Sequence, residues 1–436
     1  MTATVPGLPA RPDGAPPASG TAPEPTPPAP PAAPVVRGRR LLALSVYVRF
    51  ALAALSGPLL ARALGPAGRG VVAAVFAFDD VSTRAASFAL PEASGYFAAS
   101  GRRTPAQLLG LALRWSLALT PLMVVVAWLV ARGPLGDVPT SGQVAGFLFI
   151  ATSPFTTVAL VARHLLVAQG RLVPVAVHAV LPFAVVCAVV GALHGLHRVS
   201  LVAALATYIG AKAVAQLYLV WTGRTRPARP EGAGEVLRYA ARAFPGTLSD
   251  FLNTRLDQLM LLPLVGASDL GLYAVAANYA MVAIGLAQAS ALHALPVVAG
   301  ARPDERADRV RELLWRTAWT TTAVTAVLAV AAAWALPTLF GEAFRDSTGA
   351  ALVLLAGAVP WAVFLTGNAC LQATGRPSPG SVAQVVAVAV TALGIALVVP
   401  AHGIMGAAVV SLVAYVLRLL LVVPALRGLM RHPTAA

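Results

Sequence analysis

The chain has 436 residues, of which 58% are hydrophobic and 11% are charged, whereas about a quarter of the residues of soluble domains are charged. The formal net charge is +15, and the only lysine among the 32 Lys and Arg residues is Lys212. Because Lys212 is followed by Ala213, the chain lacks the Gly-Lys-Ser/Thr sequence of a P-loop. The arginines lie in short loops beside apolar segments, which is typical of a polytopic membrane protein and argues against a nucleic-acid partner.

The first residues of the chain differ in composition from the rest. Residues 1–36 hold 12 of the 35 prolines and few large apolar side chains. Such a segment cannot bury enough apolar surface to fold, so we predict a disordered cytoplasmic tail. The remainder is predicted to comprise an N-terminal lobe at 37–221, a cytoplasmic linker at 222–235, a C-terminal lobe at 236–430 and a short tail at 431–436.

Apolar stretches of about 20 residues, the length that crosses a bilayer as a helix, recur along the chain after this tail. They predict an all-α membrane protein with about twelve transmembrane helices. The histidines show no metal-ligand spacing, so we expect no metal and no other cofactor. The predicted spans are 41–61, 71–98, 107–131, 143–162, 172–193, 199–221, 236–264, 270–298, 313–340, 349–373, 381–400 and 404–426.

Two of these spans, 71–98 and 236–264, contain several charged residues, and charge topology supports keeping both. With both spans kept, 16 loop arginines lie on the side of the N-terminus and 5 on the opposite side. Omitting either span would invert every later loop and destroy this bias. Because positive residues are enriched in cytoplasmic loops, both termini are predicted to be cytoplasmic.

The two halves of the chain resemble each other. The segment Leu64–Val71 returns as Val265–Leu272, 201 residues later, and Leu166–Arg171 returns as Leu371–Arg376, 205 residues later. A duplicated hydrophobic chain is typical of transporters rather than of enzymes. Since each half contains an even number of spans, both halves enter the membrane from the same side. We therefore predict two pseudo-symmetric six-helix lobes, related as parallel repeats, around a central cavity.

Span 236–264 carries a polar stripe at helical spacing. Charged groups within a bilayer are costly and normally face a cavity, so we expect the stripe to bind substrate or a coupling ion. The alternative is that Asp250, Arg255 and Asp257 form interhelical ion pairs that only position the span. Arg255 points away from the centre of the stripe, where it can pair with an acid on a neighbouring helix. The stripe consists of Arg238, Arg242, Ser249, Asn253 and Asp257, with Asp250 beside it.

Span 71–98 and one residue of span 199–221 add further candidates for the cavity. Asp80 and Arg84 stand at i,i+4 with the acid first, the favourable order for an intrahelical ion pair. Asp79 has no such local partner and is the better candidate for binding a coupling ion or a proton. Lys212 lies in the middle of its span. Each of these groups either serves transport or only neutralises a neighbouring charge.

Arg49 lies in the middle of the first span and has no acid within helical reach. Adding the repeat offset of 201 residues to its position gives Asp250. Equivalent positions of parallel repeats lie opposite each other across the twofold axis. We therefore predict that Arg49 and Asp250 face each other across the cavity, as a gate pair or as two sides of a binding site.

Three short segments resemble the Wzx-type polysaccharide flippases. Leu60–Pro66, followed by Gly70, is similar to the first-loop signature of that family, Asp257–Ala276 to its seventh-span signature, and Ala373–Arg376 to the turn after its tenth span. The resemblance implies membership of the multidrug/oligosaccharidyl-lipid/polysaccharide exporter superfamily. It implies flipping of a polyprenyl-diphosphate-linked glycan to the outer leaflet of the bacterial cytoplasmic membrane by alternating access. Arginines in the cavity would suit the diphosphate.

Two other classes of protein remain open. A cation-coupled drug or metabolite antiporter of the same superfamily would use Asp79, Asp250 and Asp257 to bind its cation. A membrane-embedded glycosyltransferase, polymerase or ligase is disfavoured by the small outer loops and by the repeat, so we expect a transporter and not an enzyme. The expected partners are a lipid-linked glycan, membrane lipids, and glycosyltransferases or a polymerase of the same pathway.

Overall fold

The computed structural model describes residues 33–302, 304–376 and 378–431, and within these ranges the chain is helical without a β-strand. Most of the predicted tail at 1–36 lies outside the described residues. The helices are α1 (Ala33–Ser87), α2 (Leu90–Ala99), α3 (Pro105–Arg132), α4 (Thr140–Ala151), α5 (Ser153–Ala168), α6 (Leu172–Gly195), α7 (Leu201–Gly223), α8 (Ala233–Ala299), α9 (Arg306–Phe340), η1 (Glu342–Phe344), α10 (Ser347–Ala373) and α11 (Ser378–Arg431).

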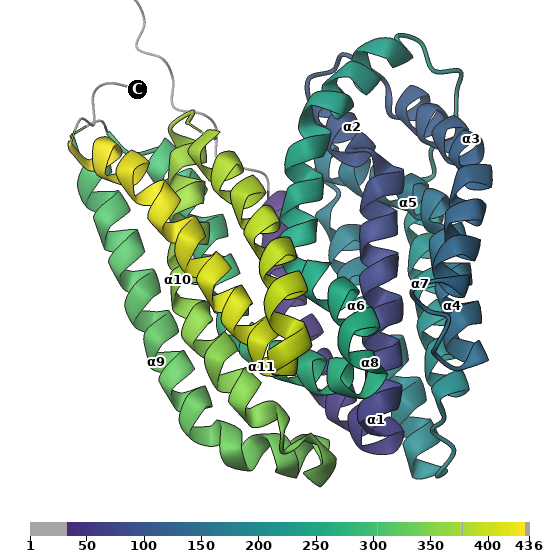
Figure 1. The fold of residues 1–436 in the computed structure, drawn as a ribbon. Helices are drawn as coiled ribbons and strands as arrows, with labels where there is room; N and C mark the ends of the chain where they lie inside the picture. Colours follow the sequence, from purple (N-terminus) through teal and green to yellow (C-terminus); the bar gives the residue numbers. More distant parts are fainter. Residues whose placement is uncertain (1–32, 303, 377, 432–436) are drawn as a thin grey trace, which may run out of the picture.

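Helices α1, α8 and α11 are each far longer than a bilayer requires, and each folds back on itself at a glycine. The glycines are Gly65, Gly266 and Gly403, with φ of 65°, 80° and 53°, a conformation that residues with a Cβ rarely adopt. Each of the three helices therefore supplies two antiparallel arms (Figure 1). Over the described ranges, eight helices are long and apolar enough to span a membrane, and α4 with α5 forms a ninth, bent by 49°. Counting the folded helices twice confirms the predicted twelve spans.

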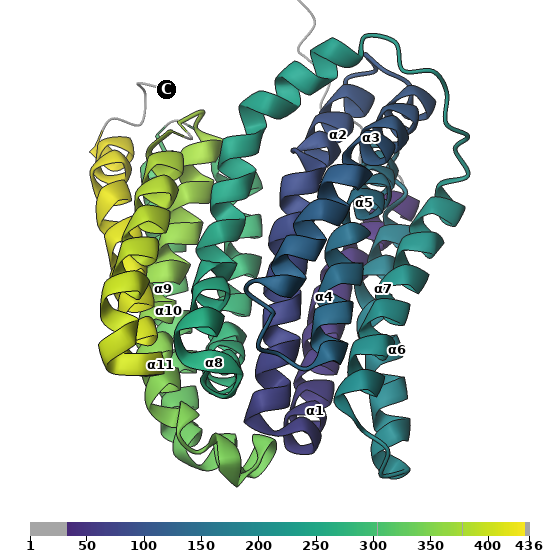
Figure 2. The same ribbon diagram turned by 45° about the vertical axis from the view of Figure 1, so that its right-hand side comes forward.

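The helices form two lobes that diverge toward one end of the molecule (Figures 1 and 2). We call α1–α7 the N-lobe and α8–α11 the C-lobe. The lobes are close together where α1, α8 and α11 fold back, which we call the glycine-turn end. At the opposite end, the linker end, lie the loop between α7 and α8 and the end of α11. The first turns of α8 belong spatially to the N-lobe, because Val236 and Ala240 share a buried cluster with Leu108 of α3.

The predicted repeat is visible in the backbone hydrogen bonds. Two residues after the end of α5 and of α10 stands a glycine with positive φ, Gly170 at 71° and Gly375 at 73°. After Gly170, the Arg171 N–H donates to the Leu166 carbonyl over 2.9 Å, and the same bond returns between the repeat-equivalent residues Arg376 and Leu371 over 2.8 Å. This is the Schellman type of helix end, which needs a residue free to adopt positive φ.

The two lobes touch backbone to backbone at the glycine-turn end. A Cβ on Gly70 would lie 1.7 Å from the carbonyl oxygen of Ala267, and a Cβ on Gly271 would lie 1.9 Å from that of Pro66. Pro66 with Ala267, and Gly70 with Gly271, are pairs of residues related by the 201-residue repeat. The pseudo-twofold axis therefore passes through this contact. Arg62 adds a second bridge by donating to the Thr338 carbonyl oxygen of the C-lobe.

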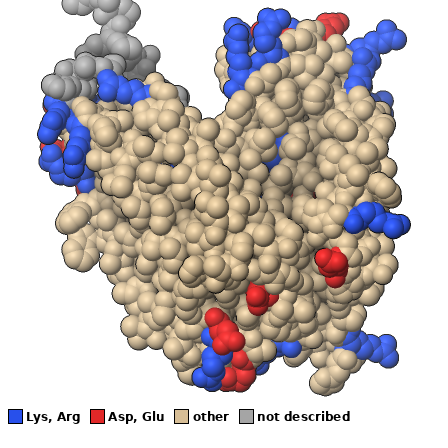
Figure 3. All heavy atoms as spheres, viewed as in Figure 1, with Lys and Arg blue, Asp and Glu red and all other residues tan. Residues whose placement is uncertain are grey.

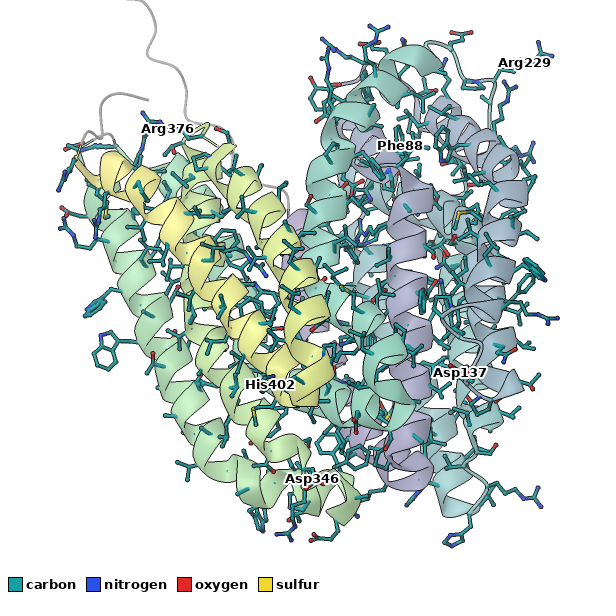
Figure 4. The ribbon with its side chains drawn as sticks, viewed as in Figure 1. Phe88, Asp137, Arg229, Asp346, Arg376 and His402 are labelled. Carbon is teal, nitrogen blue, oxygen red and sulfur yellow. The ribbon has the colours of Figure 1, made fainter. Side chains whose placement is uncertain are left out.

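Charged residues concentrate at the two ends of the molecule. In the view of Figure 3 the surface between the ends is mostly uncharged and carries only a few charged side chains, as expected for a surface in contact with lipid. Arg229 and Arg376 lie at the linker end, and Asp346 lies at the glycine-turn end (Figure 4). The space-filling view also shows that the molecule is hollowed between the lobes at the linker end (Figure 3).

Candidate substrate cavity

A cavity of about 370 Å³ lies between the lobes, a volume within the range typical of small-molecule sites. Its walls come from α1, both arms of α8, α10 and α11. It brings together four of the residues singled out from the sequence, namely Arg49, Asp80, Arg255 and Asp257. The lining residues are Arg49, Asp80, Phe251, Thr254, Arg255, Asp257, Gln258, Tyr273, Ala277, Asn278, Ala280, Met281, Ile284, Gln288, Leu354, Trp361 and Tyr415.

An ion pair joins the two lobes across this cavity. Arg255 Nε of the C-lobe donates to Asp80 Oδ2 of the N-lobe over 2.8 Å, and Arg255 Nη1 donates to Gln258 Oε1 over 3.3 Å. Arg255 therefore pairs with an acid on a neighbouring helix, as its position on α8 allowed. The predicted intrahelical pair of Asp80 with Arg84 is wrong. The i,i+4 rule considers only neighbours on the same helix. In the structure Asp80 pairs instead with Arg255 of the other lobe, and Arg84 pairs with Glu92.

The predicted span 71–98 is also not one continuous helix. Phe88 and Ala89 adopt positive φ of 49° and 53° and separate α1 from α2. Two such residues in succession are strained and require support from their surroundings. The Phe88 ring stacks on Trp115, whose Nε1 donates to the Ala86 carbonyl oxygen over 2.8 Å. The break lies in the interior of the N-lobe, at the position of Phe88 in Figure 4.

Arg84 and Arg163 lie near Glu92 at this break, and Arg49 acts on Arg163 from the first arm of α1. We call these four residues the N-lobe basic cluster. Arg84 Nη1 lies 3.2 Å from Glu92 Oε1 across the break. The Arg84 guanidinium also lies 4.0 Å from the ring centroid of Phe251, which lines the cavity. Arg163 of α5 interacts electrostatically with Arg84, Arg49 and Glu92. The cluster therefore carries more positive than negative charge beside the cavity.

Arg49 reaches the cavity from the first arm of α1. Its guanidinium lies 5.3 Å from the ring centroid of Phe50 and 5.8 Å from that of Phe183. Its predicted partner Asp250 belongs to α8, but the side chain of Asp250 lies outside the described part of the structure. The facing pair of Arg49 and Asp250 stays a prediction.

Asp79 and Lys212 form an ion pair inside the N-lobe. Lys212 Nζ donates to Asp79 Oδ1 over 2.5 Å, and Thr83 Oγ1 donates to the same oxygen over 3.3 Å. Lys212 Nζ also lies 5.1 Å from the ring centroid of Phe149. The carboxylate that has no local partner in the sequence thus has a tertiary one. Neither charged residue is among those that line the cavity.

The polar stripe predicted for span 236–264 does not face a single environment. Arg242 is exposed. Asn253 is 7% exposed, and its Nδ2 donates to the carbonyl oxygens of Ser249 and Gln384 over 2.9 Å each, which fastens α8 to α11. Asp257 does line the cavity. The cavity face of this arm is rotated from the predicted one, because Asp257 shares it with Phe251, Thr254, Arg255 and Gln258 and not with Arg242 or Asn253.

The opposite wall of the cavity, which we call the C-lobe wall, combines Asp257 with aromatic rings. The Tyr273 hydroxyl donates to Asp257 Oδ2 over 2.6 Å, and the Gln258 N–H donates to Asp257 Oδ1 over 2.7 Å. Beside them, the rings of Trp361 and Tyr415 pack with their centroids 4.6 Å apart. The side chains of Asp257, Gln258, Tyr273, Trp361 and Tyr415 thus form a surface that is partly apolar and partly hydrogen-bonding.

Sequence reasoning missed several of these groups. Arg163 lies one residue beyond the predicted span 143–162, although an arginine in an apolar run without a nearby acid was a usable signal. Trp361 and Tyr415 look like ordinary apolar residues of membrane helices, and nothing local in the sequence marks them as a cavity wall. Among the described residues, no group of three His, Cys, Asp or Glu side chains is placed to hold a metal ion.

Solved structures place this architecture in a known class. The fold is similar to that of the lipid II flippase MurJ in an inward closed conformation, with a TM-score of 0.74, 10% identity, and 89% of this chain and 87% of that chain covered. It is similar to an inward-facing multidrug resistance MATE family transporter of the MOP superfamily, with a TM-score of 0.70, 13% identity, and 92% and 100% covered. The fold is also similar to that of a MOP superfamily transporter from Pyrococcus furiosus, with a TM-score of 0.57, 13% identity, and 92% of this chain and 95% of that chain covered. The fold is therefore that of two-lobed, multi-pass membrane transporters.

The sequence narrows this class to a family. The family model described as "Polysaccharide biosynthesis protein" matches residues 59–349. The chain therefore belongs to the polysaccharide biosynthesis protein family, as the resemblance of its short motifs indicated. A search among curated proteins gave no match.

Proposed function

We propose that the protein flips a polyprenyl-diphosphate-linked oligosaccharide, or a related lipid-linked glycan, across the bacterial cytoplasmic membrane by alternating access. Its product would serve the synthesis of cell-surface polysaccharide. The observation that carries this proposal is the N-lobe basic cluster, in which Arg49, Arg84 and Arg163 outnumber Glu92 beside the cavity. A charge excess within a membrane protein is costly and is retained where an anionic ligand balances it.

A diphosphate suits this cluster on chemical grounds. Guanidinium groups offer planar pairs of N–H donors that match phosphate oxygens and bind them by charge-assisted hydrogen bonds. The Arg84 guanidinium is held by Glu92 at 3.2 Å and by the Phe251 ring at 4.0 Å. It is therefore oriented before a ligand arrives, which lowers the entropy lost on binding.

The shape of the molecule supports loading from the cytoplasm. The lobes are separated at the linker end (Figure 3) and in backbone contact at the glycine-turn end. Because loop arginines favour the cytoplasmic side, we assign the linker end to the cytoplasm and the glycine-turn end to the outer surface. The lipid-linked glycan made at the cytoplasmic leaflet would then enter between the lobes.

The alternative of a cation-coupled antiporter has less support. Two of its three candidate acids, Asp79 and Asp257, have described side chains, and each of these carboxylates already has a partner: Asp79 with Lys212 and Asp257 with Tyr273. A cation would have to displace these partners in order to bind. The three arginines beside the cavity would repel it.

Binding and flipping of a fluorescent polyprenyl-diphosphate oligosaccharide by the purified protein test the proposal. We expect Arg84→Ala or Arg163→Ala to weaken binding by about tenfold or more, because a hydrogen bond to a charged group contributes about 1.5–3 kcal/mol. Flipping in proteoliposomes should fall in parallel. Arg114→Ala is the matched control, since Arg114 is exposed on α3 of the same lobe. Unchanged binding in both cluster variants would overturn the proposal.

A further inference from the structure

The C-lobe wall of the cavity carries polar and aromatic side chains that the proposed binding of the diphosphate does not involve. It presents the Asp257 carboxylate, the Gln258 amide and the rings of Trp361 and Tyr415. Tyr273, fully buried, holds Asp257 in place through its 2.6 Å hydrogen bond. The cavity therefore has a second, separate set of recognition groups on the side opposite the N-lobe basic cluster.

The negative charge of Asp257 is only partly balanced. Its hydrogen bonds come from neutral donors, the Tyr273 hydroxyl and the Gln258 N–H. Arg255 acts on Asp257 electrostatically, but its guanidinium is already paired with Asp80 at 2.8 Å. Asp80 of the N-lobe and Asp257 of the C-lobe thus share the guanidinium of Arg255, which lines the cavity. Arg418 adds a buried positive charge behind Tyr415, so the charge that the C-lobe wall itself presents to the cavity, besides Arg255, is the Asp257 carboxylate.

The aromatic part of the wall is preformed. Arg418 is 3% exposed, and its guanidinium packs 5.0 Å from the ring centroid of Tyr415 and 5.6 Å from that of Trp361. Arg418 does not line the cavity, so it fixes both rings from behind by cation–π contacts. Trp361 and Tyr415 are 6% and 8% exposed, and the parts of their rings that line the cavity offer an apolar contact for the C–H groups of a pyranose ring. The Asp257 carboxylate beside them offers a hydrogen-bond acceptor for sugar hydroxyls.

We propose that the C-lobe wall is the glycan subsite of the cavity and that Asp257 makes it selective. The subsite accepts a neutral sugar or an amino sugar next to the diphosphate and rejects a sugar that carries a carboxylate. The selection is by charge, because a uronate placed on Trp361 and Tyr415 would face the Asp257 carboxylate. This inference rests on the proposed function, and it assigns a sugar class to that same cavity.

The test compares two synthetic lipids that differ in one group, a polyprenyl-diphosphate hexose and the corresponding polyprenyl-diphosphate hexuronate. Binding to the full-length protein in nanodiscs gives the ratio of the two dissociation constants. We expect the wild type to prefer the hexose by about tenfold, since like charges in an interface are strongly disfavoured. Asp257→Asn should reduce this preference to about twofold or less. Asp346→Asn, the same change at an exposed acid of the C-lobe, should keep it.

Equal affinity of the wild type for the two lipids, or an undiminished preference in Asp257→Asn, would overturn the inference. Failure of the proposed function gives a different result, namely no binding of glycan-free polyprenyl diphosphate to the wild type. If Asp257→Asn does not fold, Tyr415→Leu replaces it. That variant should weaken binding of the hexose lipid by about tenfold through loss of the stacking surface, and a wild-type affinity in it would equally refute a glycan subsite here.

Discussion

The adjacent carboxylates Asp79 and Asp80 have different partners because successive residues of a helix are rotated by about 100°. Asp79 pairs with Lys212 within the N-lobe, whereas Asp80 pairs with Arg255 of the C-lobe. The first pair stabilises one lobe and moves with it. The second pair bridges the lobes and must break when they separate at this level. Two neighbouring acids thus have distinct mechanical consequences.

The Asp79–Lys212 pair leads to a stability prediction. Asp79→Asn should lower the free energy of unfolding by about 3 kcal/mol, because it leaves a buried ammonium without its anion. The Lys212 and Asp79 side chains are only 21% and 12% exposed, so solvent compensates little. Replacing both charges in Asp79→Asn/Lys212→Met should recover most of the loss. Thermal unfolding of the purified variants measures both effects, and a double variant less stable than the single one would contradict the pairing.

The same double variant tests whether the Asp79–Lys212 pair serves only folding or also the coupling of transport to an ion. The sequence marks Asp79 as a candidate for a coupling ion or a proton, and that role stays a prediction. A stable double variant that no longer transports would support it, whereas normal transport would show that the pair serves folding alone. At the scale of single residues, the sequence identifies intramembrane charges well. It does not identify their partners, because those come from other helices and from the other lobe.

At the scale of elements, the glycine turns were the most predictable feature. Gly65 and Gly266 stand at repeat-equivalent positions in the sequence, and both have positive φ at the fold-back of α1 and α8. A glycine is needed there for its backbone conformation. Gly70 and Gly271 are glycines for another reason, the close approach of the opposite lobe. That contact is tertiary, so the repeat located these residues without revealing that they touch.

Alanine at these contact glycines should disturb the closed end of the molecule. Gly70→Ala and Gly271→Ala each introduce a Cβ less than 2 Å from a backbone oxygen of the other lobe, so the lobes must shift apart. We expect a loss of about 2 kcal/mol in stability, the usual cost of overpacking, and a longer distance between spin labels at Ala63 and Ser268. Gly57→Ala is the control, since a Cβ there meets nothing within 4 Å. An unchanged distance in both contact variants would contradict a rigid closure.

The break between α1 and α2 shows the limit of element prediction. Loop charge supports keeping 71–98 as one span, and Pro91 is the only local sign of an interruption. The break itself depends on Phe88 stacking on Trp115 and on the hydrogen bond from Trp115 to the Ala86 carbonyl. These contacts come from α3, and a reading of one span at a time cannot include them. The N-lobe basic cluster, which forms around this break, was for the same reason only partly predictable.

At the scale of the whole molecule, the parallel arrangement of the lobes follows from an even number of spans per half. The end at which the lobes close does not follow from the sequence, because the repeat places similar turns in both lobes at each end. The structure resolves this through the backbone contact at Gly70 and Gly271 and the hollow at the linker end. The structure alone does not say which end of the molecule faces the cytoplasm. The distribution of loop arginines predicts that the linker end does.

Cysteine labelling in cells tests that orientation. In a background of Cys187→Ala/Cys370→Ala, we expect Asp346→Cys at the glycine-turn end to react with a membrane-impermeant maleimide in intact cells. Arg226→Cys at the linker end should react only after the membrane is permeabilised. Both positions are exposed, so accessibility depends on the side of the membrane and not on burial. The reverse pattern would place the open end of the cavity outside the cell, where a substrate made at the cytoplasmic leaflet could not enter it, and would thereby refute cytoplasmic loading.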